Sequence, residues 1–569
     1  MRSYPNIALW YEGPYEDESE EWHSRRILGG IPRNKISVDT ETITTKDQTC
    51  IGLGIGLSSQ EAYYFGVLPQ RSPLVDAAVD MAASKHRTKL YHNANYDIQV
   101  LRQLATAEEL SLPDVWNIED TANLAHVSGR RAALDIVAEE AGVEGLFTIP
   151  QLLDETRARL GKTRINMLDV DPNSVAQKCL NDVRSTWAIF DYLQGKLTLQ
   201  QLDCYLVDRQ CFSILKTVES RGFEIDHEVL ENHYTELSKS VTLFSDQCNN
   251  MGFSPSNPQQ VGYILATRGN ILPFTKTRRQ LKTDDETLSA IDDPVAHMVL
   301  AYRRANKLLS TYVKPWRDAD RAFTHFRLDL STGRLASYDR NLQNVPESMR
   351  SIFSPDSGVF TWADISQLEM RVFAYMSQDK VMLDAYQSGK DIHSITHEGL
   401  FSHMGAAGRA PAKTFNFAMI YDAMDKTLSK RTGLPLDVAS RYKAEWLTFY
   451  SGAAKWMREQ ANADVTVVED IYGRAMILPE LIVDPYTGRD NQKHIDTCKI
   501  NYPVQGSGAS IVKRGINYLW ANGYGDAYRL QVHDEHVLDG DVDFPKVELD
   551  NLNPLVPTPH DVKRGNKWL

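Results

Sequence analysis

Four acidic residues in the N-terminal third of the chain have a spacing that could hold metal ions. Asp39 and Glu41 lie two positions apart in the strand-like segment ISVDTET, so their side chains project from one face. Asp97 begins a helical run in HNANYDIQVL, and Asp182 lies on a second helical segment, KCLNDVRSTWAIFDYL. Taken singly, each acid is more often a surface residue or a helix cap. As an ordered set they could bind two Mg²⁺ ions about 4 Å apart, which would activate water and stabilise the leaving oxygen of a phosphodiester.

A second acidic set lies toward the C-terminus. Asp364 ends the strand-like segment GVFTWAD, and His533, Asp534 and Glu535 lie in LQVHDEHVLDG, which has the pattern of a β-hairpin. The roughly 170 residues between Asp364 and Asp534 are enough for a complete helical insertion. If neighbouring strands bring the two aspartates together, they form another two-metal site. One ion would lower the pKa of an attacking hydroxyl, and the other would neutralise a triphosphate.

Between these acids, the segment RAPAKTFNFAMIYD carries a stripe of cations and aromatic residues. Arg409, Lys413, Phe417 and Tyr421 recur every four residues, so they lie on one slowly drifting face of a helix. This pattern suits a nucleoside triphosphate, with its phosphates on Arg409 and Lys413 and its base against Phe417. The alternative is an amphipathic helix that buries Phe and Tyr in a core. For the stripe taken alone, that alternative is the more frequent one.

Composition limits the remaining possibilities. The 569 residues predict three or four domains, and 42% hydrophobic with 24% charged residues is ordinary globular composition. A net charge of −13 argues against a histone-like coat protein, although a basic groove can be local. The six scattered cysteines form no CxxC pair, which favours free thiols in a reducing compartment over a zinc ribbon. Because the sequence has neither a signal-peptide pattern nor a membrane-spanning run, we expect a soluble, cytoplasmic protein without a membrane partner.

The chain divides into regions of different pattern. Residues 1–34 are polar and irregular and are predicted to form a lead-in loop. Three strand-like runs followed by helical patterns indicate an α/β domain at 35–195, and 196–310 is helix-rich. In the remainder, strand-like segments flank a long helical block. The cation-rich segments 275–282 and 302–327 are candidate phosphate contacts, or else solvated helix faces.

These ordered blocks resemble family A (polymerase I-like) DNA polymerases. DISQLEMR resembles motif A, RAPAKTFNFAMIYD resembles motif B and QVHDEHV resembles motif C. The segments TGRLASYDRNLQNVP, GRAMILPE, NYPVQGSGASIVKR and DVKRGNKWL also match in order. DTET, NANYD and LND resemble the three motifs of DEDD-type 3′–5′ exonucleases. The resemblance covers the chain from about residue 35. Since this leaves no room for a flap-type 5′ nuclease domain, the chain is more similar to phage replicative polymerases than to repair enzymes.

The resemblance implies a fold and its boundaries. An α/β, RNase H-like exonuclease domain would precede a right-hand polymerase of α+β type, with an antiparallel palm sheet and helical fingers and thumb. Residues 1–34 would be the N-terminal lead-in and 35–195 the 3′–5′ exonuclease domain. The expected polymerase parts are the thumb at 196–310, the first part of the palm at 311–375, the fingers at 376–499 and the second part of the palm at 500–569.

The resemblance also implies roles for individual residues. Glu535 would support the catalytic metal ligands, and Glu369 would be a steric gate that rejects a ribose 2′-hydroxyl. Lys413 would bind the triphosphate and protonate pyrophosphate. The implied metal ligands, for Mg²⁺ that Mn²⁺ can replace, with two ions in each site, are Asp39, Glu41, Asp97, Asp182, Asp364 and Asp534. The implied substrate contacts are Arg409, Lys413, Phe417 and Tyr421 for the incoming nucleotide, and Arg334, Gln343, Asn344, Asn501, Gln505 and His533 for primer and template.

The expected function is therefore template-directed DNA synthesis with proofreading. The chain would add dNTPs to the 3′ end of a DNA primer by two-metal phosphoryl transfer, and its exonuclease would remove mispaired ends. We expect primer–template DNA and dNTPs as partners, and a monomer that acts in viral DNA replication in the cytoplasm of a phage-infected host. Accessory partners would be a helicase, a single-strand binding protein and a processivity factor.

Four positions depart from the family pattern. Lys178 stands four residues before Asp182, where the Tyr form of the third exonuclease motif has its tyrosine, and Gln177 stands in the His-type register. In motif B, Ala418 and Asp422 stand where glycine is usual. Lys178 leaves open a polymerase whose exonuclease domain is silent. A non-catalytic DNA-binding homologue is a further alternative, and an RNA polymerase of related fold is disfavoured by Glu369.

Overall fold

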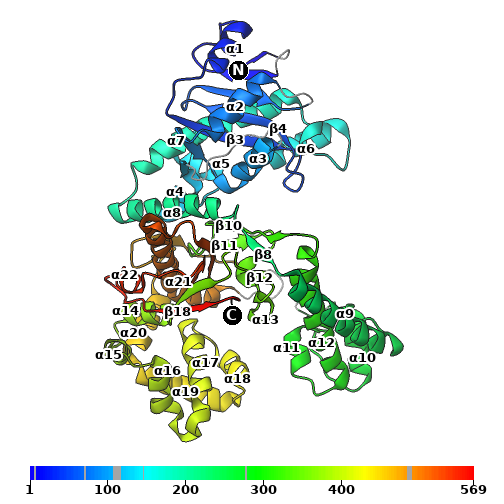
Figure 1. Cartoon of the computed structure of the whole chain (residues 1–569), viewed down its shortest axis with the longest axis vertical. Helices are drawn as coiled ribbons and strands as arrows, with labels where there is room; N and C mark the ends of the chain where they lie inside the picture. The colour runs from blue at the N-terminus through cyan, green and yellow to red at the C-terminus, as the bar shows by residue number, and fades with distance from the viewer. Residues whose placement is uncertain are drawn as a thin grey trace.

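The computed structural model describes residues 1–568 except for 5–7, 69–71, 107–116, 145, 276–278 and 484–489. Figure 1 shows an N-terminal α/β domain above a central antiparallel sheet, with two groups of helices below that sheet, one on each side. The chain returns to the central sheet after forming the helices. In the part of the chain that the structure describes, no helix is both long and apolar enough to span a membrane.

The N-terminal domain is built on a seven-stranded mixed sheet with the order β1-β2-β5-β4-β3-β6-β7. Strands β3, β4 and β5 are antiparallel neighbours, whereas β3, β6 and β7 run parallel. The strands are β1 (Arg2–Tyr4), β2 (Leu9–Glu12), β3 (Lys35–Thr42), β4 (Cys50–Gly56), β5 (Ala62–Gly66), β6 (Thr88–Tyr91) and β7 (Ile118–Asp120).

Helix α7 (Pro172–Gln194) packs closely against β3 and β4. Strand β4, with the sequence CIGLGIG, is buried along its whole length. A Cβ added at Gly54 would lie 2.6 Å from the Sγ of Cys179 on α7, so glycine permits this approach. The remaining helices of the domain are α1 (Glu20–Leu28), α2 (Pro73–Ala83), α3 (Ala94–Thr106), α4 (Thr121–Val127), α5 (Leu134–Glu140) and α6 (Ile149–Leu160).

The structure corrects the predicted lead-in loop at 1–34. Strand β2 pairs antiparallel with β5 through Leu9 and Phe65, β1 extends the sheet, and α1 packs against α2. Leu9 and Tyr11 are buried, so this segment belongs to the domain assigned to 35–195. The strands escaped prediction because they are only three and four residues long and precede an acidic stretch.

Helix α8 (Leu199–Val218) joins the N-terminal domain to the palm, which we define as the sheet β16-β17-β13-β18 with helices α14 and α21. It contacts α4 on one side and α21 on the other. Asp208 of α8 is fully buried and accepts hydrogen bonds from Arg474 at 2.5 Å and from Lys513 of α21 at 2.8 Å. The expected thumb range 196–310 therefore includes a helix that packs on the palm.

The palm sheet collects strands that are far apart in sequence. Strand β13 (Phe360–Ile365) lies between β17 (Glu535–Asp539) and β18 (His560–Gly565), and β16 (Tyr528–Val532) pairs with β17. All of these pairs are antiparallel, as expected. Two helices accompany the sheet, α14 (Leu368–Ser377) and α21 (Gln492–Leu519), which pack against one another. Helix α21 runs across the expected boundary between 499 and 500.

The thumb, defined here as helices α9 to α12, is an arm with a hydrophobic cluster of its own. It leaves the palm after β8 (Phe223–Ile225), which pairs with β9 (Arg321–Ala322) and β12 (Phe353–Ser354). The long helices α9 and α12 pack together along the arm. The thumb helices are α9 (His227–Asn250), α10 (Pro258–Thr267), α11 (Asp285–Ser289) and α12 (Pro294–Leu308).

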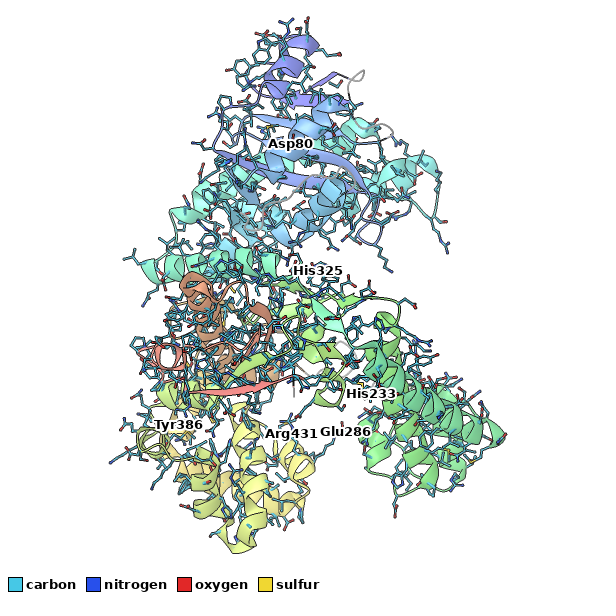
Figure 2. All side chains as sticks on the ribbon, viewed as in Figure 1. Asp80, His233, Glu286, His325, Tyr386 and Arg431 are labelled. Carbon is cyan, nitrogen blue, oxygen red and sulfur yellow. The ribbon has the colours of Figure 1, made fainter. Side chains whose placement is uncertain are left out.

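The fingers, defined here as helices α15 to α20, lie on the other side of the palm (Figure 1). The tip of the fingers reaches the thumb, because Lys430 of α18 lies 3.0 Å from Glu286 of α11. Glu286 and Arg431 mark the two sides of this contact in Figure 2. The helices are α15 (Lys380–Gln387), α16 (Ile392–Thr396), α17 (Arg409–Ile420), α18 (Asp425–Thr432), α19 (Leu436–Phe449) and α20 (Ser451–Asn462), and a hairpin of β14 (Val467–Glu469) and β15 (Ala475–Ile477) follows them.

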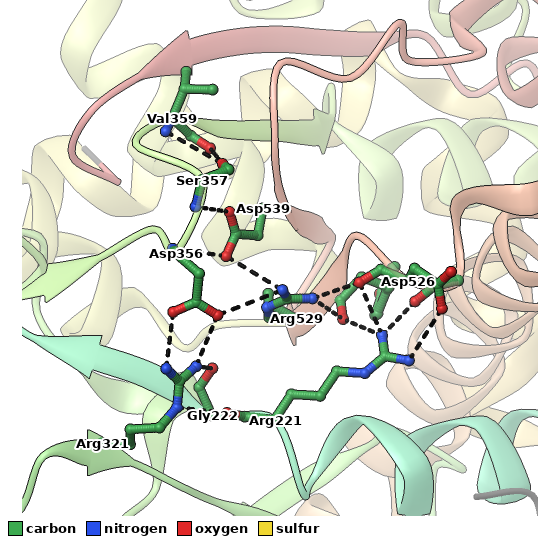
Figure 3. Close-up of polar contacts among 11 residues, drawn as sticks. Arg221, Gly222, Arg321, Asp356, Ser357, Val359, Asp526, Arg529 and Asp539 are labelled. Atoms are coloured by element: carbon green, nitrogen blue, oxygen red, sulfur yellow. Dashed lines mark hydrogen bonds and ion pairs between the residues drawn. The ribbon is translucent and has the colours of Figure 1, made fainter.

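A network of arginines and aspartates fixes the base of the thumb to the palm (Figure 3). Arg321 of β9 binds Asp356 with two hydrogen bonds of 2.8 and 3.0 Å. Arg529 of β16 lies between Asp356 and Asp539, at 3.6 and 3.3 Å. Arg221 donates a hydrogen bond of 3.0 Å to the carbonyl of Tyr528. The start of the arm is therefore tied to the sheet that carries the C-terminal acids.

Candidate active sites

The C-terminal acids meet at one end of the palm sheet. Asp364 on β13 is the cross-strand partner of Glu535 on β17 and of Asp561 on β18. The amide of Ile365 donates a hydrogen bond of 3.1 Å to the carbonyl of Asp534, which lies in the turn between β16 and β17. The structure thus brings Asp364 and Asp534 to the same edge, although roughly 170 residues separate them in the sequence.

The electrostatics of this edge fit a divalent cation. Burial raises the pKa of Asp534 to about 7; the Glu369 carboxylate adds to this rise and Arg334 opposes it. Burial also raises the pKa of Asp364, and Asp561 adds to it. These carboxylates repel one another because they are close together and partly shielded from water. Their oxygens are the hard ligands that divalent cations such as Mg²⁺ prefer, and a bound cation would relieve the repulsion.

Glu535 is held beside the two aspartates by other partners. Its Oε1 accepts a hydrogen bond of 2.8 Å from the indole of Trp568 and lies 3.6 Å from the guanidinium of Arg350. These contacts direct the carboxylate into the protein, which suits the supporting role that the sequence predicts. Sequence reasoning did not single out Asp561, because an acid in a polar terminal segment carries no signal until the strand register is known.

Glu369 forms the wall of a pocket next to Asp534. Its Oε1 accepts a hydrogen bond from Arg334, and its Oε2 accepts one of 2.6 Å from the hydroxyl of Tyr421. Burial raises the pKa of Tyr421, and the neighbouring Glu369 adds to this effect. The carboxylate is therefore fixed from two sides. The pocket is lined by Arg334, Leu335, Glu369, Gly508, Ala509, Val512, Gln531, His533 and Asp534.

The predicted stripe on α17 faces the open side of the helix. Arg409 and Lys413 are exposed, and Phe417 and Tyr421 are half-buried. The buried face of α17 is formed by other residues, Ala412, Phe415, Asn416, Ala418, Met419 and Ile420. The two cations of the stripe are thus free of the core, whereas Phe417 and Tyr421 pack partly against it, as the amphipathic alternative expects. Ala418, one of the departures in motif B, belongs to the buried face.

Arg409 is held by an acid that the sequence did not identify as part of a site. Its Nη2 lies 2.7 Å from Oδ2 of Asp391, and Gln367 donates a hydrogen bond of 2.8 Å to the other oxygen of that carboxylate. Although burial opposes ionisation, hydrogen bonds from Ser394, Arg409 and Gln367 lower the pKa of Asp391 below its ordinary value. In the sequence, the segment DIH at 391–393 could have drawn attention to Asp391, because an acid that starts a helix often serves as its cap.

The residues predicted to contact primer and template differ in how exposed their side chains are. Gln343 is buried and donates hydrogen bonds of 2.7 and 3.2 Å to the side chain and carbonyl of Gln531, so it packs inside the palm in this structure. Asn344 and His533 are exposed, and Gln505 is half-buried. Asn501 is buried, and its Oδ1 has no hydrogen-bond partner among the described residues. Part of the cationic segment 275–282 lies outside the described residues.

The N-terminal acids also come together. Asp39 and Glu41 lie on β3, and Asp97 at the start of α3 accepts hydrogen bonds of 2.9 and 2.7 Å from the amide and hydroxyl of Thr40. Asp182 approaches from α7, where its carboxylate is 2.6 Å from the ammonium of Lys178. The same ammonium lies 2.8 Å from Glu41. The motifs predicted from sequence therefore share one buried cluster, and Lys178 lies inside it.

Burial dominates the electrostatics of this cluster. It raises the pKa of Asp97 to about 7, against hydrogen bonds from Thr40 that lower it. It also raises the pKa of Asp39 well above the ordinary value, although Lys178 opposes this. The Sγ of Cys179 lies 3.3 Å from the Oδ2 of Asp39. The carboxylates are suitable ligands for a hard divalent cation, whereas Glu41 and Asp182 already contact an ammonium.

An antiparallel palm sheet with acids at its edge, flanked by helical fingers and a thumb, is the right-hand polymerase fold. The family model for DNA polymerase family A matches residues 224–558, and the chain belongs to this family. The resemblance noted from the sequence motifs is thereby confirmed for the polymerase part.

The chain is similar to several bacterial DNA polymerases I. It is 27% identical to that of Caldicellulosiruptor bescii over 497 residues, covering 79% of this chain and 56% of the relative. It is 26% identical to that of Pseudomonas aeruginosa over 599 residues, covering 94% of this chain and 63% of the relative. With Bacillus subtilis the identity is 30% over 374 residues, which cover 60% and 42%. The chain thus spans roughly half the length of these relatives.

A solved structure has the same fold. The POL domain of Pol1 from M. smegmatis, in complex with DNA primer-template and dNTP, superimposes with a TM-score of 0.73. The match covers 96% of this chain and 97% of that chain at 21% sequence identity. At this identity the likeness establishes the fold, and the roles of individual residues are argued from the geometry above.

Proposed function

We propose that this protein is a template-directed DNA polymerase that adds dNTPs to the 3′ end of a DNA primer. The observation that carries the proposal is the meeting of Asp364 and Asp534 at the edge of the palm sheet, beside the pocket walled by Glu369. DNA polymerases of family A use divalent metal ions, generally Mg²⁺. Asp364 and Asp534 would hold two such ions, which lower the pKa of the primer hydroxyl and neutralise the triphosphate.

The reaction itself is a phosphoryl transfer. The primer 3′-hydroxyl loses its proton to water and its oxygen forms a bond to the α-phosphorus, while the bond from that phosphorus to the bridging oxygen of the β-phosphate breaks. Arg409 and Lys413 are exposed on α17, where they bind the triphosphate, and Lys413 gives a proton to the leaving pyrophosphate. This chain's side chains thus contribute positioning, charge and a proton.

Other residues of the pocket select the substrate. Glu369, fixed by Arg334 and Tyr421, excludes a ribose 2′-hydroxyl by occupying its place. Phe417 packs on the incoming sugar, and Tyr421 flanks the new base pair. Primer and template near the terminus are followed by Arg334, Asn344, Asn501, Gln505 and His533, which read minor-groove acceptors that all base pairs share. Gln343 joins them only when it releases Gln531, to which it is hydrogen-bonded in this structure.

The proposal extends to the N-terminal domain as a DEDD-type 3′–5′ exonuclease that removes mispaired ends. It is supported by the clustering of Asp39, Glu41, Asp97 and Asp182 on β3, α3 and α7. A silent exonuclease domain is the second candidate, and one observation favours it. Lys178 holds two of the four acids and stands where a tyrosine would orient the attacking water.

The biological setting that we propose is viral DNA replication. The resemblance of the motifs to phage replicative polymerases supports a virus-encoded replicase. It would act as a monomer in the cytoplasm of a phage-infected host. Its accessory partners would be a helicase, a single-strand binding protein and a processivity factor. Primer–template DNA and dNTPs are the partners that the geometry of the palm supports directly.

A labelled primer–template with one 3′-terminal mismatch tests both activities. The primer is followed on a denaturing gel with Mg²⁺, with and without dNTPs, for the wild type, Asp364→Ala and Asp39→Ala. We expect shortening without dNTPs and extension with them, and each variant should lose only its own activity. Extension of a matched primer without trimming of the mismatched end would establish the silent exonuclease. Failure to extend any primer would overturn the polymerase proposal.

A further inference from the structure

The acidic cluster of the N-terminal domain already contains a positive charge. The Lys178 ammonium lies 2.8 Å from Oε1 of Glu41 and 2.6 Å from Oδ2 of Asp182. The side chains of Lys178, Glu41 and Asp182 are 9%, 3% and 9% exposed. Because Lys178 and Asp182 are four residues apart on α7, they share the helix face that contacts β3. The ammonium therefore belongs to the cluster and not to the surface of α7.

This position conflicts with the binding of two metal ions. A Mg²⁺ ion binds carboxylate oxygens at about 2.0–2.1 Å and requires near-octahedral geometry. An ion on Glu41 and Asp182 would have to share their oxygens with the ammonium and would lie next to its charge. Repulsion between close cations is large in a place that is screened from water. While Lys178 keeps its two bonds, a metal ion is excluded from this side of the cluster.

On the other side of the cluster, no ammonium or guanidinium of the described residues contacts Asp39 or Asp97 directly. Oδ1 of Asp97 is oriented by the amide and hydroxyl of Thr40, and Asp39 lies on the same strand between these groups and α7. Ligand atoms of Asp39, Glu41 and Cys179 lie within 4.8 Å of one another, so one ion could use Asp39 together with Oε2 of Glu41, the oxygen that Lys178 does not contact. One divalent ion and one ammonium carry three positive charges against four carboxylates, whereas two divalent ions and the ammonium would carry five.

We propose that Lys178 is the resident cation of the N-terminal acidic cluster and that the cluster binds one divalent metal ion instead of two. This inference rests on the proposed exonuclease site. It goes beyond that proposal because it states how many metal ions the site binds and which residue takes the place of the second ion. Lys178 is thus a positioning residue for Glu41 and Asp182. A purely structural ion pair is the competing explanation, and it predicts no change in metal binding when Lys178 is replaced.

The direct test counts bound Mn²⁺ by calorimetry. The full chain carries Asp364→Asn and Asp534→Asn, so that the palm acids do not contribute. We expect one equivalent with Lys178 present, two in Lys178→Met, and one in Lys178→Arg, which keeps the positive charge. Two equivalents with Lys178 in place would overturn the proposal, and so would a stoichiometry that Lys178→Met leaves unchanged.

Thermal unfolding of the same proteins gives an independent readout. Without metal, Lys178→Met should unfold at lower temperature, because four carboxylates then face one another without a cation. Mn²⁺ should restore most of this loss, and its stabilising effect should be several-fold larger than in the protein with Lys178. A loss in Lys178→Met that Mn²⁺ does not restore would show that the pair is structural and would overturn the proposal.

A separate assay keeps the metal count distinct from the proposed activity. Trimming of a single-stranded 5′-labelled oligonucleotide by the wild type, with its palm acids intact, reports on exonuclease chemistry alone. Two Mn²⁺ equivalents in Lys178→Met without trimming by the wild type would support the metal inference and refute the proposed exonuclease. Trimming by the wild type together with two Mn²⁺ equivalents in the protein with Lys178 would support the proposed exonuclease and refute the metal inference.

Discussion

Lys430 at the tip of the fingers lies 3.0 Å from Glu286 at the tip of the thumb, so an ion pair joins the two groups of helices across the palm. Both side chains are more than half exposed, at 53% and 57%. Ion pairs in such positions contribute about 0–1 kcal/mol and are screened by salt. The contact can therefore open at little cost, as the proposed binding of primer–template DNA between thumb and fingers would require.

Reversing the charge of Lys430 should separate the two tips. All six cysteines are buried, so cysteines introduced at exposed Ser289 and Arg431 would accept a fluorophore pair selectively. We expect the efficiency of resonance energy transfer between the two fluorophores to be lower in Lys430→Glu than in the parent protein. The parent should show a similar decrease at about 1 M salt, where the Debye length is about 3 Å. Lys426→Glu on the same helix is the matched control, and an equal decrease in that control would refute the role of the pair.

Removing the charge of Asp391 should strengthen nucleotide binding. In the structure Asp391 holds Arg409 at 2.7 Å, so a triphosphate has to displace this carboxylate. The pair is partly exposed, and its loss should lower the KM for dNTP by up to about fivefold, with kcat retained. Steady-state primer extension by Asp391→Asn measures this, with Asp384→Asn on α15 as control. A higher KM in Asp391→Asn would show that the acid aids nucleotide binding instead.

Glu369 should determine the choice between deoxyribose and ribose. Glu369→Ala removes the carboxylate that Arg334 and Tyr421 fix in the pocket, so ribonucleotide incorporation should rise by at least about tenfold relative to the wild type. Tyr421→Phe keeps Glu369 but removes the 2.6 Å hydrogen bond, and a smaller increase is expected. Single-nucleotide incorporation of rNTP and dNTP measures both. Unchanged discrimination in Glu369→Ala would refute the assignment of the gate.

Asp208 should be essential for stability, because its carboxylate pairs with both Arg474 and Lys513 in the buried junction of α8 and α21. Asp208→Asn leaves the two buried cations without this charge and should lower the free energy of unfolding by about 3–5 kcal/mol. Urea denaturation measures this loss. Asp203→Asn is the control: its side chain is 58% exposed in a surface pair with Arg514, so a change below about 1 kcal/mol is expected.

The same site predicts a pH dependence. Burial opposes ionisation of Asp208, but Arg474 and Lys513 outweigh it and lower its pKa below the ordinary value of 3.8. A carboxylate whose pKa is lower in the folded than in the unfolded protein contributes its full stabilisation at any pH above its unfolded-state pKa. That contribution to the free energy of unfolding is lost as the pH falls through the folded-state pKa. Stability should therefore decrease below about pH 4 in the wild type, and that part of the decrease should be absent in Asp208→Asn.

The sequence predicted those parts of the molecule in which residue type and spacing carry the information. The strand-like segment ending in Asp364 and the hairpin pattern around Asp534 indicated the palm strands, and the four-residue spacing from Arg409 to Tyr421 indicated one face of α17 and its C-cap. These signals are local, so they do not depend on knowing which elements become neighbours. The family was recognisable from the order of such segments.

Features that depend on distant neighbours could not be predicted. Gln343 is buried because Gln531, in another part of the chain, satisfies its amide. Asp561 faces Asp364 only through the register of β13 and β18. Lys178 could be recognised as a departure from the family pattern, but its bond to Glu41 required the approach of α7 to β3. The strands before residue 13 were missed because three or four residues give no periodicity.

The most direct test of the proposed polymerase is single-nucleotide incorporation on four primer–templates that differ only in the first unpaired template base. Each dNTP is supplied alone with Mg²⁺, to the wild type, to Asp534→Asn and to Asp543→Asn, an exposed control. We predict that the wild type and the control add only the complementary nucleotide on each template. Asp534→Asn should be slower by at least about 100-fold, because metal-held charge contributes several kcal/mol. Incorporation that ignores the template base, or that survives in Asp534→Asn, would contradict the proposed function.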